Sequence, residues 1–358
     1  MDSKERAMLA LTHQIPDRVP VDYLYNSGID LRLKNHFGLR PEDDEGLRLK
    51  LGVDFRNLGG VPYVGPKLHG DLPGRIIDEW GIHRRWVEHG SGGYWDYCDF
   101  VLKDATLDTI AAWPLPSPDD YDYSGVDAFC DQYSRYCIVA GNAGIPDIIN
   151  ASGMVWTMEK VLIAVATDEP AFVTYLDRKL AVLFEIWSRT LEKARGKIDL
   201  FYMGEDLGTQ IGPMISLKLF RRFFRPRIQT FVDLAKNYHL PVMFHSCGSS
   251  SWAFEDFIDM GINVMDTLQP EAKAMDASYL KSTFGSRLAF HGCISTAGPL
   301  AFGSVGDTVA HARQVLEIMM PGGGYAFSPS HQIQDNSPTE NVVVLYETAA
   351  RYGLYSHS

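Results

Sequence analysis

The sequence predicts an α/β fold, specifically a (β/α)8 TIM barrel, and three observations support this prediction. After residue 136, short apolar segments alternate with helical segments at about 25 to 45 residues per unit. The apolar segments are nearly continuous, which is typical of buried parallel strands. The length of 358 residues suits one barrel with insertions. An open doubly wound sheet is the alternative, but no Gly-x-Gly-x-x-Gly follows the first strand.

The N-terminal part supplies the first two predicted strands. Ser3–His13 predicts a short amphipathic helix, and Val19–Tyr25 alternates between apolar and polar residues as a strand does. Residues 29–51 predict helix, with an acidic first turn at residues 41–45. Val53–Leu58 predicts the second short strand, which Gly59 and Gly60 end.

Residues 61–130 interrupt this rhythm, because tryptophans and tyrosines crowd there among glycines and prolines. We predict an aromatic-rich insertion at about residues 61–130 that contains a β-hairpin, within a single barrel domain spanning residues 1–358. Structureless loops of this length are uncommon unless they are functional. The aromatic side chains therefore either cover a substrate mouth or pack the insertion onto the barrel.

The alternation from residue 136 onward completes the predicted barrel. Six further strands are expected at Cys137–Ala140, Leu200–Met203, Val242–Phe244, Asn263–Leu268, Leu288–Phe290 and Tyr325–Phe327. Helices are expected at Val155–Ala166, Pro170–Ala194, Ser216–Asn237, Trp252–Met260, Ala277–Phe284, Gly306–Met320 and from Pro338 onward, with Ser337 as the N-cap of the last one. With the two N-terminal strands, these six make the eight strands of a barrel.

Composition excludes several classes of function. The formal net charge of -12 and the pI of about 5.4 argue against nucleic acid or an anionic membrane as the main partner. No apolar run approaches the ~20 residues of a membrane span, and no signal-peptide core follows the charged N-terminus. The five cysteines predict reduced thiols in a cytoplasmic protein, not a disulfide framework.

His245 and Cys247 are the first candidates for chemistry. They follow the apolar run Val242–Phe244, and residues i and i+2 of an extended chain point to the same face. An imidazole and a thiolate placed side by side form half of a zinc-like site. The alternative is a packed histidine beside a buried free cysteine.

Polar residues also end the neighbouring predicted strands. The strand ends carry Glu205 with Asp206, His245 with Cys247, His291 with Cys293, and His331. In a barrel the carboxyl ends of the strands converge at one face, where active sites lie. A nucleophile pair between His331 and either Cys247 or Cys293 is conceivable, but two thiols and several imidazoles around one point suit a metal better.

These residues belong to a longer set of motifs that resembles the uroporphyrinogen decarboxylase-like superfamily, and within it the cobalamin (corrinoid)-dependent methyltransferases. The matching motifs are Glu5-Arg-Ala-Met with Pro16-Asp-Arg-Val-Pro20, Asp206-Leu-Gly-Thr-Gln210, Phe244-His-Ser-Cys-Gly248, Gln269-Pro270, His291-Gly292, Gly323-Gly-Tyr and Pro329-Ser-His331. They run nearly end to end, and the His-Ser-Cys-Gly and Pro-x-His motifs are the most specific. The resemblance implies a (β/α)8 barrel.

The methyltransferase branch implies a zinc site. His-x-Cys there supplies two ligands, which match His245 and Cys247, and a cysteine that ends the last strand supplies the third. His331 occupies that third position here, so this chain departs from the thiol-rich pattern, with Cys293 and Asp206 as substitutes. Methylcobalamin would be carried by a partner corrinoid protein. Asp206, His245 and Cys247 are the expected catalytic residues.

The decarboxylase branch fits less well. It carries an arginine pair around a glycine after the first strand, and the corresponding Tyr25-Asn-Ser-Gly28-Ile29 has neither arginine. A tetrapyrrole with several carboxylates would find no fixed counter-charge there. The pocket is therefore expected to take a smaller, less charged molecule. Its expected substrate-binding residues are Tyr25, Asn150, Trp156 and Gln210.

The sequence thus predicts a zinc-dependent methyltransferase that moves a methyl group between a small O-, N- or S-methyl compound or thiol and a corrinoid protein. The main alternative is a metal-free lyase of the decarboxylase type acting on a smaller carboxylate substrate. A third possibility is a barrel that binds a corrinoid or tetrapyrrole without catalysis.

Overall fold

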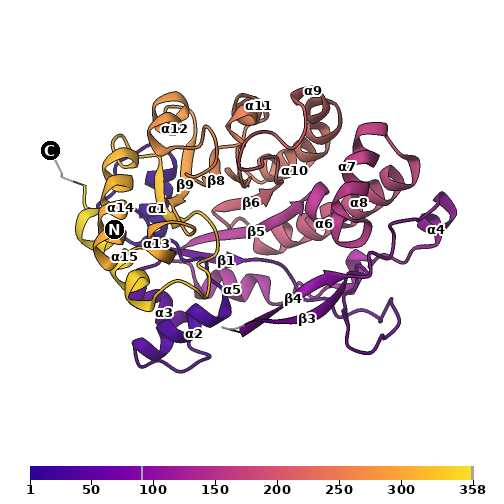
Figure 1. Ribbon diagram of the computed structural model, residues 1–358, viewed down its shortest axis with the longest axis horizontal. Helices are drawn as coiled ribbons and strands as arrows, with labels where there is room; N and C mark the ends of the chain where they lie inside the picture. The colour runs from indigo at the N-terminus through magenta and orange to yellow at the C-terminus, as the bar shows by residue number, and fades with distance from the viewer. Residues whose placement is uncertain (90–91, 356–358) are drawn as a thin grey trace.

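The computed structural model describes residues 1–89 and 92–355 and is built around a parallel sheet of seven strands (Figure 1). The strand order is β1-β5-β6-β7-β8-β9-β10, and every neighbouring pair is parallel. The strands are β1 Phe55–Leu58, β5 Cys137–Pro146, β6 Leu200–Gly204, β7 Val242–His245, β8 Val264–Thr267, β9 Ala289–Ile294 and β10 Tyr325–Pro329. The α/β class and these seven predicted strands are therefore present.

The first predicted strand, Val19–Tyr25, does not join this sheet as a strand. It makes two isolated parallel bridges, Val21 to Phe327 and Tyr25 to Ile333, next to β10. Pro20 has no N–H to donate, and the N–H of Val21 donates to the Asp54 carboxylate at 2.9 Å. The segment thus contacts both edges of the curled sheet without a continuous ladder, and a complete eight-stranded barrel is not formed by the described strands.

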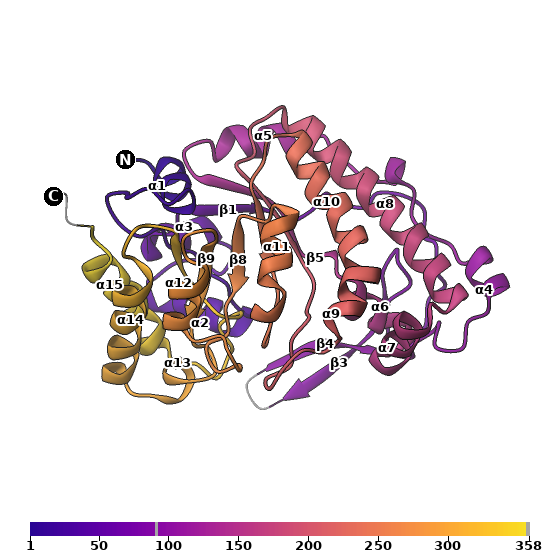
Figure 2. The same ribbon diagram turned by 90° about the horizontal axis from the view of Figure 1, so that it is seen from above.

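Helices surround the outer side of the curled sheet (Figure 1, Figure 2). These helices are α2 Ser27–His36, α3 Asp44–Leu51, α4 Leu107–Ala112, α5 Val126–Gln132, α6 Ile148–Trp156, α7 Met158–Thr167, α8 Pro170–Ala194, α9 Leu217–Leu219, α10 Arg225–Asn237, α11 Phe254–Met260, α12 Ala277–Phe284, α13 Pro299–Phe302, α14 Val305–Met319 and α15 Thr339–Tyr352, whereas α1 Ser3–Leu11 packs at the amino ends of the strands. Most hydrophobic side chains of the core lie between this layer and the sheet.

Two predicted helices are broken in the structure. The region 29–51 forms α2 and α3, which are separated where Gly38 has a φ of 67° and Pro41 follows. The region 155–166 lies across the junction of α6 and α7, where Thr157 has a φ of 80° and its side chain caps the N–H of Lys160. No single described helix is long and apolar enough to span a membrane. Only α6 and α7 together reach that length and composition, and they bend by 118°.

The inside of the sheet is closed at one end by α1. Ala7 and Leu11 of α1 pack with residues at the amino ends of the strands, including Cys137, Leu200 and Val264. All five are buried. The amino end of the sheet is therefore filled, which leaves the carboxyl end for a cavity and a site.

An antiparallel sheet lies in the region predicted as an insertion. Its strands are β2 Ile76–Ile77, β3 His83–His89 and β4 Gly92–Cys98, with Trp86 opposite Trp95. Both tryptophans are about half exposed. They line a cavity of about 670 Å³ together with Tyr25 and His331, so this hairpin lies beside the carboxyl end of the larger sheet.

Asp54 holds the N-terminal segment to β1. Its buried carboxylate accepts hydrogen bonds from Arg6 Nη1 at 2.8 Å, from Arg18 Nη1 at 2.7 Å and from the N–H of Val21. Two guanidinium groups and one backbone donor therefore depend on one side chain.

We predict that Asp54→Ala lowers the free energy of unfolding by about 3–5 kcal/mol, because it removes the buried carboxylate shared by Arg18, the N–H of Val21 and Arg6, of which only Arg6 keeps a second anionic partner, Asp17. Urea unfolding followed by circular dichroism measures this loss. Glu42→Ala is the control, since Glu42 forms an exposed pair with Arg40 and should change stability little. Equal stability of the two variants would contradict this role of Asp54.

Candidate active site

The strand register brings the polar strand ends together. Gly204 of β6 pairs with His245 of β7, His245 pairs with Asp266 of β8, and Asp266 pairs with His291 of β9. Neighbouring parallel strands lie about 4.8 Å apart, so residues in register are side by side. The strand ends expected to converge on β6, β7 and β9 therefore lie side by side, with Asp266 of β8 between His245 and His291.

Asp266 joins the two histidines. Its carboxylate lies 2.8 Å from His245 Nδ1 through one oxygen and 2.5 Å from His291 Nδ1 through the other, and Tyr202 donates its hydroxyl at 2.7 Å. Asp266 is buried. Burial by itself raises the pKa of this carboxyl, but the two histidines outweigh burial and hold the pKa well below its usual range.

His245 is oriented by these contacts. Asp266 and the Thr267 hydroxyl, 3.0 Å away, lie at its Nδ1, so its Nε2 is left toward the site. Nε2 is 3.3 Å from Cys247 Sγ and 3.5 Å from Asp206 Oδ1. Burial lowers the pKa of His245, but the surrounding acceptors raise it well above its ordinary value.

Asp206 lies at the Nε2 edge of His245, across the ring from Asp266, and is itself held in place. The N–H of Cys247 donates to Oδ1 at 2.8 Å, and Asn150 Nδ2 donates to Oδ2 at 2.8 Å. Burial raises the pKa of Asp206, but His245 and these hydrogen bonds lower it to about 2. The carboxylate is therefore ionised at neutral pH.

Glu205, the neighbour of Asp206, positions a helix. Its carboxylate accepts hydrogen bonds from the N–H of Ile148 at 2.5 Å and of Ile149 at 3.0 Å. These two donors belong to the first turn of α6, where a helix offers its N–H groups no acceptor of its own. Burial and the nearby Asp147 raise the pKa of Glu205 well above its ordinary value. Because α6 carries Asn150, Glu205 fixes the helix that holds Asp206.

Asp206, His245 and Cys247 form a group that fits a metal ion. One donor atom from each lies within 4.8 Å of the others. Imidazole, thiolate and carboxylate are all zinc ligands. The Asp266 carboxylate behind His245 is the arrangement that fixes a metal-binding imidazole. The residues present therefore fit zinc.

The two other residues considered as ligands lie outside this group. His331 is exposed, and its Nδ1 is 3.3 Å from Gln334 Nε2. Cys293 is buried, and burial raises the pKa of its thiol to about 12. Within residues 1–89 and 92–355, the side chain found together with His245 and Cys247 is that of Asp206. Zinc binding by His331 stays a prediction.

The predicted substrate residues are dispersed. Tyr25 lines a cavity next to the site, and Asn150 contacts Asp206. Gln210 is exposed and accepts a hydrogen bond from Gln269 at 3.2 Å. Trp156 is buried on α6 and packs against aromatic side chains of α8, so the structure places it in the hydrophobic core.

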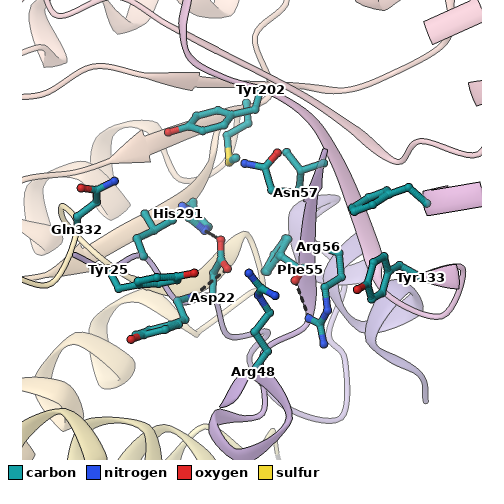
Figure 3. Close-up of a pocket in the computed structure, with 15 residues that line it drawn as sticks. Asp22, Tyr25, Arg48, Phe55, Arg56, Asn57, Tyr133, Tyr202, His291 and Gln332 are labelled. Atoms are coloured by element: carbon teal, nitrogen blue, oxygen red, sulfur yellow. Dashed lines mark hydrogen bonds and ion pairs between the residues drawn. The ribbon is translucent and has the colours of Figure 1, made fainter. Parts of the chain in front are cut away.

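A cavity of about 450 Å³ adjoins the site on the inner side of the sheet (Figure 3). It is lined by Asp22, Tyr23, Leu24, Tyr25, Arg48, Phe55, Arg56, Asn57, Phe129, Tyr133, Val139, Tyr202, Met243, His291 and Gln332. The Tyr202 hydroxyl is 3.2 Å from His245 Nδ1, and His291 Nε2 is 3.1 Å from Asp22 Oδ2. The cavity is therefore connected through Tyr202 and Asp266 to the group of Asp206, His245 and Cys247, which we call the metal-type group.

Sequence reasoning missed Tyr202, Asp266, Asp22 and Arg48. Asp266 had a usable signal, because a carboxylate inside an otherwise apolar strand must be paired when it is buried. The other three carry no local signal, since only the curvature of the sheet turns them toward one cavity.

The comparisons with known proteins agree with this fold. Residues 198–352 match the family model described as Uroporphyrinogen decarboxylase (URO-D). The resemblance to the uroporphyrinogen decarboxylase-like superfamily that the motifs predict is therefore confirmed over these residues. No curated protein matches the sequence.

Among solved structures, the chain is similar to a methyltransferase from Methanosarcina mazei. The alignment covers 98% of this chain and 99% of that one, with a TM-score of 0.62 and 16% sequence identity. At this level of identity, the likeness establishes the fold.

The histidine pair predicts a pH dependence of stability. Burial lowers the pKa of His291, but Asp22 and Asp266 raise it to about 10. A histidine whose pKa is higher when folded stabilises the fold fully below its unfolded value of about 6.5. That contribution is lost as the pH rises toward the folded value.

We therefore predict that the free energy of unfolding falls between pH 6.5 and pH 10, and that His291→Gln removes part of this fall. Urea unfolding at both pH values measures the difference. His36→Gln, at an exposed position at the end of α2, should keep the wild-type slope. An unchanged slope in His291→Gln would refute the raised pKa.

Proposed function

We propose that this protein is a zinc-dependent methyltransferase that moves a methyl group between a small O-, N- or S-methyl compound or thiol and a corrinoid protein. The observation that carries the proposal is the Asp206, His245 and Cys247 group, with Asp266 fixing the imidazole. Its position at the carboxyl ends of the strands, next to a cavity, is where barrel enzymes carry out catalysis.

His245 Nε2 and Cys247 Sγ are the proposed zinc ligands, with Asp206 as the third donor within reach. Zinc would supply Lewis acidity and keep a bound thiol ionised. Asp266 holds His245 in the tautomer that leaves Nε2 free to bind, and Asn150 holds Asp206. His331 and Cys293 are retained as alternative third ligands.

The small substrate would occupy the cavity lined by Tyr25 and Tyr202. Its volume of about 450 Å³ lies within the range of small-molecule sites. At one end of this cavity the Tyr202 hydroxyl lies 3.2 Å from His245 Nδ1, so a substrate there would be separated by the imidazole ring from the zinc proposed at Nε2. The methyl carrier would be methylcobalamin on a partner corrinoid protein.

The partner would approach at the carboxyl ends of the strands, beside the hairpin of β3 and β4. An acidic chain docks on such a partner through local complementarity and not through bulk charge. We also propose a cytoplasmic location, which the five free cysteines support.

The proposal is tested by methyl transfer in a defined mixture. Zinc-loaded protein is mixed with methylated corrinoid protein and a panel of thiols. In the reverse direction it is mixed with unmethylated corrinoid protein, chemically reduced to the Co(I) state, and with phenyl methyl ethers and methylamines. We expect a change in cobalamin absorbance with at least one compound. His245→Ala should slow this change by about a hundredfold or more, whereas His36→Gln should not.

No absorbance change in either direction with any compound would contradict the methyltransferase proposal. That outcome would favour a metal-free lyase acting on a smaller carboxylate. Tight corrinoid binding without turnover would instead favour a binding protein.

A further inference from the structure

Most of the charged side chains that line the cavity next to the site have a partner of opposite charge, and one does not. Arg56 is neutralised by Glu45, whose two oxygens accept from Nε at 2.8 Å and from Nη2 at 2.7 Å. Asp22 lies 3.1 Å from His291 Nε2 and accepts the N–H of Tyr23 at 2.8 Å. These charged side chains therefore already have partners within the protein.

Arg48 differs from them. It projects from α3 into the cavity (Figure 3) and is half-buried. Within residues 1–89 and 92–355, no hydrogen bond or ion pair of its guanidinium is found. Its charge reaches Tyr25, since Arg48 opposes the rise in pKa that burial imposes on that phenol. A partly desolvated cation without an anion is unfavourable, so the cavity is suited to an incoming anion.

The remaining walls define the rest of the ligand. Tyr25, Phe55, Phe129 and Tyr133 present aromatic rings, and Asn57 and Gln332 present amides. Such walls favour a compact apolar or aromatic body. Among the described lining residues, Arg48 is the one cation without an anionic partner, which favours one negative charge over several.

We propose that the substrate is a small carboxylate whose single anionic group binds the Arg48 guanidinium. The planar guanidinium can receive the carboxylate through two parallel hydrogen bonds. The apolar body lies against Tyr25 and Phe55. That the end carrying the methyl group points toward Tyr202 and His245 rests on the proposed methyltransferase function. The charge requirement does not rest on it.

A carboxylate fits this site better than the other common anions. A phosphate ester carries up to two negative charges at neutral pH, and the second charge would lie in a cavity that already contains Asp22. A tetrapyrrole with several carboxylates would need several unpaired cations. The site therefore recognises a monoanion.

The experiment measures binding to purified protein by isothermal titration calorimetry, without metal or corrinoid protein. The probes are 4-methoxybenzoate, methoxyacetate, their primary amides and phenyl phosphate. The variants are Arg48→Met, which keeps the length of the apolar stem, Arg48→Lys, which keeps the positive charge, and Lys50→Met. Lys50 is exposed on the same helix and does not line the cavity, so it controls for the change in net charge.

We expect wild-type protein to bind at least one carboxylate about tenfold or more tightly than its amide. Phenyl phosphate should bind more weakly than 4-methoxybenzoate. Arg48→Met should abolish the preference over the amide, Lys50→Met should keep it, and Arg48→Lys should restore part of it. Thermal unfolding of each variant shows whether the fold is retained.

The inference is overturned if no carboxylate binds more tightly than its amide, or if Arg48→Met keeps the preference. Tighter binding of phenyl phosphate would assign the site to phosphate esters instead, which also overturns it. These results are independent of methyl transfer. A selective carboxylate site without turnover would contradict the proposed function only, and turnover of neutral compounds alone would contradict this inference only.

Discussion

The site depends on one buried carboxylate. Asp266 contacts the Nδ1 atoms of His245 and His291 from adjacent strands and accepts the hydroxyl of Tyr202. A carboxylate buried in this way is stable only with such partners, and each partner is oriented by it in return. The result is that His245 Nε2 faces Cys247 and Asp206, and His291 Nε2 faces Asp22 in the cavity.

The fold explains why the cavity and the metal-type group lie together. Helix α1 fills the inner side of the sheet at the amino ends of the strands, so open space is left toward the carboxyl ends. Parallel pairing in register aligns the polar ends of β6 to β9 there. Asp54 then holds the segment that carries Asp22 and Tyr25 between β1 and β10. One cavity wall therefore comes from the N-terminus and the other from the later strands.

The sequence was most informative where local pattern and structure coincide. The strand that ends in His245, with Cys247 two residues beyond, was predictable because alternation and apolar character are properties of consecutive residues. The strand at 19–25 was not, because Pro20 and the Asp54 carboxylate interrupt its ladder. Arg48 was equally hidden, since its helix also carries exposed cations and only the fold turns Arg48 inward. For the proposed metal site, sequence position favoured His331 as the third ligand with Cys293 and Asp206 as substitutes, and Asp206 is the one whose carboxylate lies near His245 and Cys247.

The most direct test of the account is a crystal structure of the zinc-soaked protein, with diffraction collected on both sides of the zinc absorption edge. The account predicts one anomalous peak per chain, within bonding distance of His245 Nε2 and Cys247 Sγ, with Asp206 as a further ligand and His245 Nδ1 still bound to Asp266. No anomalous peak at saturating zinc, or a peak only at a place away from His245 and Cys247, would contradict it.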